Sequence, residues 1–169
     1  PDGGGASLAV RHCLFAGNGA DGFDADLSSP LGGGNLGGLF RIRVEDCDFV
    51  GNALAGGLID IEYEATPAWR SQIVIRGCKA RANGLHGLHL DLDSQAEVFV
   101  HRLATSGNLG DGMHVSSETH AGLATVSASA FQANGGAGLR ATFGNFPLIA
   151  SHCIFAGNLG GGFLSDFST

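Results

Sequence analysis

Histidine and arginine side chains recur at one position of successive segments of this 169-residue chain. Six glycines each follow an asparagine by four residues, and the position two residues after such a glycine holds His89, His114 and Arg140 in three consecutive segments. Imidazoles act as general bases, and a guanidinium binds a negatively charged substrate group. The spacing therefore makes these three residues the candidate catalytic residues.

Carboxylates occupy the positions four and six residues after the same glycines, as in Asp60, Glu62, Asp91 and Asp93. Paired parallel strands would place these four side chains about 4.8 Å apart between strands and about 7 Å apart along a strand. Such a quartet suits Ca²⁺, which binds several carboxylate oxygens. It also suits a paired-carboxylate hydrolase, in which crowding raises one pKa to produce a general acid. The four residues are the predicted metal site.

Further polar residues are candidates for binding a substrate beside these columns. They are Asp24, Asp26, Glu118, Trp69 and Arg70. The three acidic residues extend the carboxylate face. The other two lie in the segment 65–72, where the only Trp and an adjacent Arg suit stacking on a sugar ring. This segment and the Gly-rich segment 28–39 are predicted to wall a groove.

An internal repeat must position these side chains. Its asparagines are Asn18, Asn52, Asn83, Asn108, Asn134 and Asn158, separated by 34, 31, 25, 26 and 24 residues. Residues ten, eight, five and three before each Asn form largely apolar columns, and alternation with period two predicts strands rather than helices. Asn and Gly tolerate the left-handed conformation of a sharp corner, so the Asn-x-x-x-Gly segment is predicted to be a turn. A stack of about six such units forms one all-β solenoid domain over 1–169.

The four cysteines share the position five residues before the Asn, at 13, 47, 78 and 153. One repeat position favours buried, reduced core thiols over a disulfide framework, although Cys13 and Cys47 would be close enough to bridge. No Cys-x-x-Cys or His-x-x-x-His spacing is present, so the sequence does not predict a zinc site. His12 and His152 precede cysteines as repeat residues, and His86 is expected to face solvent in a turn.

The segments 10–18 and 150–158 match a loose consensus of apolar, small and Asn-x-x-x-Gly positions. In this pattern the chain resembles the right-handed parallel β-helix repeat proteins of the pectate-lyase-like superfamily. The resemblance implies that the strand after the glycine lines a polysaccharide groove. It also implies that a thiol stack replaces the amide ladder often found five residues before the Asn.

No catalytic motif transfers with this resemblance. The Asn-Thr-Asp, Asp-Asp, Gly-His-Gly and Arg-Ile-Lys motifs of polygalacturonases are missing, as is the Asp-Pro-His-Asp motif of alginate epimerases. The only Lys, Lys79, falls on a different strand, so Arg140 is the one residue that matches the Arg or Lys base of pectate lyases.

Charge and hydropathy exclude some partners. With 9 basic and 16 acidic residues the net charge is −7, which opposes binding to a phosphate backbone, so no nucleic-acid partner is expected. No apolar run approaches the roughly 20 residues that span a bilayer. Neither end shows a cap, so we expect a segment of a longer β-helix or self-association through the ends.

Several functions fit these residues. The first is a polysaccharide-binding or polysaccharide-processing module of a secreted or cell-surface protein, with a lyase or glycoside hydrolase as the enzyme class and Ca²⁺ as the cofactor. The alternative is a non-catalytic structural or adhesive segment of a large extracellular protein, and a trimeric fibre resembling a phage tailspike is a third. An acidic outward face is also what solubility alone requires.

Overall fold

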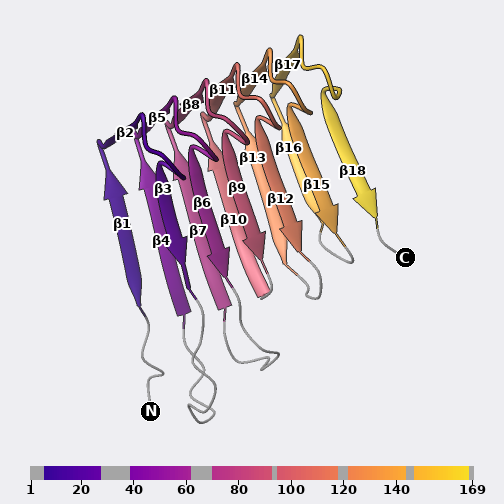
Figure 1. Ribbon diagram of the computed structural model, residues 1–169. Coiled ribbons are helices and arrows are strands. Elements are labelled where there is room, and N and C mark those ends of the chain that lie inside the picture. The colour runs from indigo at the N-terminus through magenta and orange to yellow at the C-terminus, as the bar shows by residue number, and fades with distance from the viewer. Residues whose placement is uncertain are drawn as a thin grey trace, which may run out of the picture.

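Three six-stranded parallel sheets form the computed structural model (Figure 1). The structure describes residues 6–27, 39–61, 70–92, 95–117, 122–143 and 147–167. Each coil contributes one strand to each sheet in turn, so the molecule is a right-handed parallel β-helix of about six coils. No helix in these described ranges has the length and hydropathy to cross a membrane.

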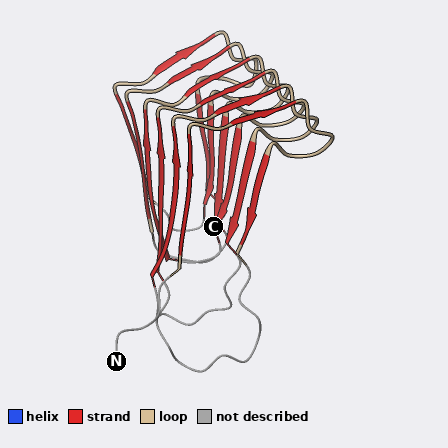
Figure 2. Ribbon diagram, turned by 90° about the vertical axis from the view of Figure 1, so that its left-hand side faces the viewer, coloured by secondary structure: helices blue, strands red, loops and turns tan. Residues whose placement is uncertain are grey.

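The three sheets are named here A, B and C in the order in which the chain visits them. Sheet A contains β1 (Ser7–Arg11), β4 (Leu39–Glu45), β7 (Arg70–Arg76), β10 (Gln95–His101), β13 (Leu123–Ser127) and β16 (Leu148–Ser151). Sheet B contains β2 (Leu14–Ala16), β5 (Asp48–Val50), β8 (Lys79–Arg81), β11 (Ala104–Ser106), β14 (Ala130–Gln132) and β17 (Ile154–Ala156). Sheet C contains β3 (Phe23–Asp26), β6 (Gly57–Ile61), β9 (Leu88–Leu92), β12 (Met113–Ser117), β15 (Leu139–Phe143) and β18 (Phe163–Phe167). Figure 2 shows the short strands of sheet B across the top, between the long strands of the other two sheets.

Strand pairing has the register that the apolar columns predict. Leu8 pairs with Ile42, and Val98 pairs with both Ile73 and Ala124. Along β9 the side chains alternate between buried and half-buried, so every second residue enters the core between the sheets. Alternation therefore determines which residues of sheet C face outward.

An asparagine ladder runs along the corner between sheets B and C. The Nδ2 atom of Asn52 donates to Oδ1 of Asn83 at 3.0 Å, and Nδ2 of Asn83 donates to Oδ1 of Asn108 at 2.8 Å. Each backbone N–H of these two residues donates to the same oxygen as the side chain does. An amide ladder is therefore present beside the stacked thiols, at the repeat Asn itself.

The prediction that the repeat Asn and Gly adopt the left-handed conformation is wrong. Positive φ angles instead occur six residues and one residue before each Asn, at positions such as His12 and Gly17, and at Gly161. The repeat glycine is required for a different reason, because a Cβ atom on Gly56 would overlap the carbonyl oxygen of Gly87 in the next coil. Close approach of successive corners thus selects Gly at this position.

The four cysteines are free thiols in the core column, as predicted. Cys47 and Cys78 are fully buried, and Cys13 and Cys153 are half-buried. Burial raises the pKa of the Cys78 thiol to about 11, because the apolar core disfavours a thiolate. Cys47 and Cys78 therefore act as core packing residues rather than as reactive thiols.

Candidate functional site

Three imidazoles gather on the outer face of sheet C, next to the corner with sheet B. His89 of β9 pairs in register with His114 of β12, and their rings lie tilted by 31° with centroids 5.0 Å apart. His86 lies in the turn before β9, and its ring meets those of His89 and His114 edge-on at 5.3 and 4.9 Å. Parallel stacking of two coils and one tight turn thus bring the three rings together.

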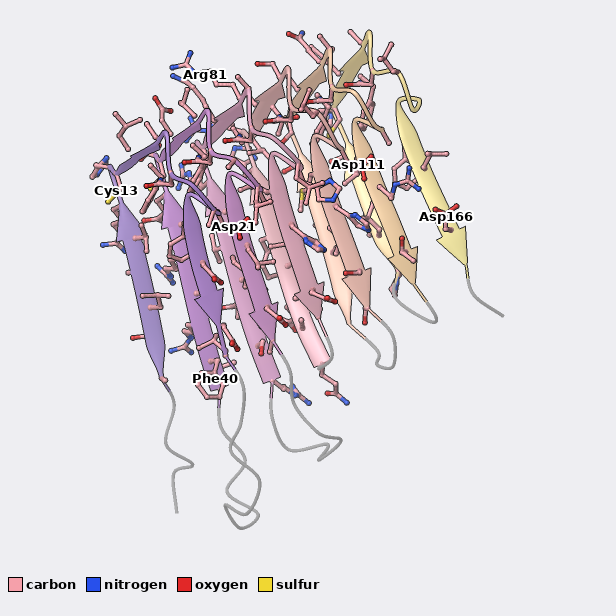
Figure 3. The ribbon with its side chains drawn as sticks, viewed as in Figure 1. Cys13, Asp21, Phe40, Arg81, Asp111 and Asp166 are labelled. Carbon is pink, nitrogen blue, oxygen red and sulfur yellow. The ribbon has the colours of Figure 1, made fainter. Side chains whose placement is uncertain are left out.

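Asp111, in the turn before β12, is the centre of this cluster (Figure 3). Its side chain is only 5% exposed. The Oδ1 atom accepts the N–H of Ala137 at 2.6 Å, and Oδ2 accepts Nε of Arg140 at 3.0 Å. The same Oδ2 lies 3.5 Å from Nδ1 of His114 and 3.6 Å from Nδ1 of His86. One buried carboxylate therefore faces two imidazoles and a guanidinium.

Arg140 of β15 connects this carboxylate to a second one. Its Nη1 donates to Oδ2 of Asp166 at 3.0 Å, so the guanidinium joins a buried and an exposed acid. Arg140 follows His114 in the register of sheet C, which confirms the predicted column of His89, His114 and Arg140.

The environment keeps the imidazoles neutral near pH 7. Burial, with a smaller contribution from the neighbouring His114, lowers the pKa of His86 to about 4. Burial also lowers the pKa values of His89 and His114, while Asp111 opposes the change at all three rings. In addition, Nδ1 of His86 accepts the backbone N–H of Asp111 at 3.0 Å, which requires an unprotonated Nδ1. Neutral rings retain lone pairs for a proton or a metal ion.

One polar atom of the cluster lacks a hydrogen-bond partner within the described ranges of the chain. Nδ1 of His114 is buried and unpaired among the described residues, although the Asp111 carboxylate lies 3.5 Å away. Its Nε2 lies at 3.5 Å from Oγ1 of Thr142. An unpaired buried nitrogen in a native fold requires an explanation, such as an unseen ligand or a functional role.

A shared backbone contact explains part of the arrangement. The residue before the repeat glycine accepts an N–H from the equivalent residue of the next coil in three cases. Asp21 accepts from Ala55 at 2.8 Å, His86 from Asp111 at 3.0 Å, and Asp111 from Ala137 at 2.6 Å. These acceptors therefore also hold successive turns together.

The sequence interpretation missed Asp111 and misplaced His86. The prediction that His86 faces solvent is wrong, because its side chain is 14% exposed and contacts the other two rings. The signal was present in the column before the repeat glycine, where Asp21, His86 and Asp111 are the polar residues.

Only some of the predicted acidic residues lie in the part of the chain that the structure describes. Asp60 pairs in register with Asp91, and Asp91 accepts Oγ of Ser116 at 2.9 Å. Asp24 and Asp26 are exposed on β3, further along the same sheet. Three predicted acids and the tryptophan lie outside the described residues, namely Glu62, Asp93, Glu118 and Trp69.

Arg70 does not lie on the face of sheet C. It begins β7 in sheet A, where it pairs with Leu39 and Gln95. With Glu97 and Leu123 it helps to line a hollow of about 340 Å³ at the amino-terminal ends of strands in that sheet. Arg70 therefore lies on a different sheet from the histidine cluster.

Stability of the metal-free protein should fall as the pH falls from about 6.5 to 4. His86, which faces Asp111, His89, His114 and Arg140, remains neutral in the fold while the unfolded chain takes up a proton below about pH 6.5. The unfolded chain then binds more protons than the folded one. The free energy of unfolding therefore decreases by at most about 1.4 kcal/mol for each pH unit of acidification on account of this histidine. Urea unfolding between pH 7.5 and 5, with chelator present, measures this slope. His86→Gln should flatten it, and an unchanged slope would contradict the assignment.

Scans of this chain against family models, curated proteins and solved structures found no match.

Proposed function

We propose that the outer face of sheet C binds a polysaccharide, and that the chain is a carbohydrate-binding or carbohydrate-processing module of an exported protein. The observation that carries this proposal is the buried Asp111 beside three neutral imidazoles and Arg140, on a sheet face where Asp91 and Ser116 also point outward. Parallel strands repeat these side chains about every 4.8 Å, which suits a linear polymer better than a compact ligand.

The cluster has the parts of an acid–base site. Asp111 faces Nδ1 of His114, an arrangement that orients an imidazole and stabilises its protonated form after it takes a proton through Nε2. Arg140 uses Nε and Nη1 on the two acids, which leaves further N–H groups for a substrate carboxylate. This chemistry supports a lyase or a hydrolase acting on an acidic sugar.

The wider face supports the same proposal. The β-helix architecture agrees with the resemblance to the pectate-lyase-like superfamily, in which the corresponding strand lines a sugar groove. Asp60 and Asp91 are neighbours in sheet C, and with Glu62 and Asp93 they are the residues that we propose to hold Ca²⁺. A bound cation of this kind would bridge the acidic face to an acidic polymer.

Binding to a panel of acidic and neutral polysaccharides tests the proposal. We expect at least one polymer to bind, and His114→Ala to weaken binding at least tenfold. His101→Ala is the matched control, because His101 lies on sheet A and its ring contacts only Ser127 among the hydrogen-bond partners described. Release of unsaturated or reducing ends then reports catalysis. Failure of every polymer to bind, or equal losses in both variants, would exclude the site.

A structural role is the second candidate, and one observation favours it. Asp21, His86 and Asp111 make the same contact to the next coil, so selection for a rigid rod alone would also place acceptors there. On this alternative the chain is a structural or adhesive segment of an extracellular protein. Normal stability together with no glycan binding would support it.

A further inference from the structure

We propose that His86, Asp111 and His114 form a binding site for a transition-metal dication, with Zn²⁺ as the preferred ion. One ligand atom from each residue lies within 4.8 Å of the others, in the part of the chain that the structure describes. The site does not depend on the proposed function, because metal binding by this cluster requires no polysaccharide.

The separations between donor atoms fit a shared metal ion. Oδ2 of Asp111 lies 3.5 and 3.6 Å from the two Nδ1 atoms, beyond the usual range of an N–H···O hydrogen bond. Two ligands bound tetrahedrally at about 2.0–2.1 Å are separated by about 3.4 Å, which follows from the bond lengths and angle. Small shifts of these side chains would therefore complete the coordination.

The unpaired nitrogen of His114 gives an independent reason. Nδ1 is buried, has no hydrogen-bond partner among the described residues, and faces the carboxylate. A metal ion between the two would satisfy the nitrogen and the oxygen together. His86 differs, because coordination through Nδ1 would replace the hydrogen bond that this atom accepts from the Asp111 N–H.

Hydrogen bonds to both oxygens of the Asp111 carboxylate hold it in place. Oδ1 accepts the Ala137 N–H, and Arg140 donates to Oδ2 while it is itself held by Asp166. Ligating carboxylates are typically fixed by hydrogen bonds of this kind. The charge of the Arg140 guanidinium opposes a cation, and its two partners Asp111 and Asp166 offset that charge.

The donor types select the metal. Two imidazoles and one carboxylate suit Zn²⁺, whereas Ca²⁺ and Mg²⁺ prefer oxygen ligands alone. His89 stands beside His114 with ring centroids 5.0 Å apart but outside the group of gathered donor atoms, so the fourth position is left to water or a further ligand. Three protein ligands with an open position are typical of zinc sites that bind a further molecule.

Calorimetry with Zn²⁺ on the chelator-treated full chain tests the proposal. We expect one ion per chain with a micromolar or lower Kd, at least tenfold weaker binding in His114→Ala, and no change in His101→Ala. Co²⁺ should give the intense visible bands of a tetrahedral nitrogen and oxygen site, without the near-ultraviolet thiolate band that binding at Cys13 would produce. Zn²⁺ should also raise the Tm of the wild-type protein but not that of His114→Ala.

Further variants keep the test decisive if a histidine variant is poorly folded. Asp111→Asn retains an oxygen for the Ala137 N–H and removes the anionic ligand, so it should also weaken Zn²⁺ binding at least tenfold. Far-UV circular dichroism checks folding in each case. A folded wild-type protein with a Kd above about 100 µM, or binding that survives both His114→Ala and Asp111→Asn, would overturn the site. Neither result bears on polysaccharide binding, which is measured without Zn²⁺ and with Ca²⁺ supplied.

Discussion

Asn108→Ala should lower the free energy of unfolding by about 3 kcal/mol, because it removes a fully buried amide from the middle of the ladder. Its Oδ1 accepts the N–H and Nδ2 of Asn83, and its Nδ2 donates to Ala80 O and Asn134 Oδ1. The variant leaves buried donors and acceptors of both neighbouring coils without this partner. Each buried group left unpaired costs about 1–3 kcal/mol. Urea unfolding monitored by circular dichroism measures the change.

Asn18→Ala is the matched control for this prediction. Asn18 occupies the same repeat position but is exposed, and its side chain donates one hydrogen bond, to Oδ1 of Asn52. We expect a loss below about 1 kcal/mol, the usual net value of one such bond. Similar losses in both variants would show that burial in the ladder adds nothing to the stability of a coil.

Asp111→Ala should also destabilise the fold by about 3 kcal/mol, and it should disrupt the histidine cluster. The N–H of Ala137 loses its acceptor, and Arg140 loses one of its two carboxylates. The Asp111 carboxylate attracts the protonated form of each histidine and so raises all three pKa values. Its removal should therefore lower the pKa values of His86, His89 and His114. Chemical denaturation measures the stability, and NMR titration of the imidazole resonances measures the pKa values.

Asp21→Ala separates the two roles of Asp111. Asp21, at the position of an earlier coil that is equivalent to Asp111, accepts the Ala55 N–H of the next coil, and no ion pair to Arg or His is seen for it among the described residues. We expect this variant to cost about 1 kcal/mol, with the imidazole resonances of His86 and His114 largely unchanged. If the two variants are equally destabilising, Asp111 serves only to connect successive turns.

Much of the fold could be predicted from the sequence. The columns at Leu8 and Ile42, and at His89, His114 and Arg140, appear in the structure with the register that their distance from the repeat Asn predicts. Period-two alternation leaves only one face of each strand for the core, and a shift by one residue would expose every apolar side chain. Register and outward face are therefore properties of the pattern alone.

The corner between sheets B and C shows where sequence reasoning fails. Gly is compatible with either a positive φ angle or a position without room for a Cβ atom, and the pattern does not distinguish these causes. The structure places the left-handed residues at positions such as His12 and Gly17, and places Gly56 against the next coil. Only the packing of successive coils separates the two reasons for the same residue.

The repeat pattern alone predicts the coils, the inward and outward faces, and the column that contains His89, His114 and Arg140. Only the folded chain shows that His86 turns toward the cluster and that the Asp111 carboxylate faces both His86 and His114. Turn side chains follow no alternation, so their direction depends on contacts with the next coil, such as the N–H groups of Asp111 and Ala137. The cluster is therefore a product of stacking, because residues 25 apart in sequence meet only when one coil packs on another.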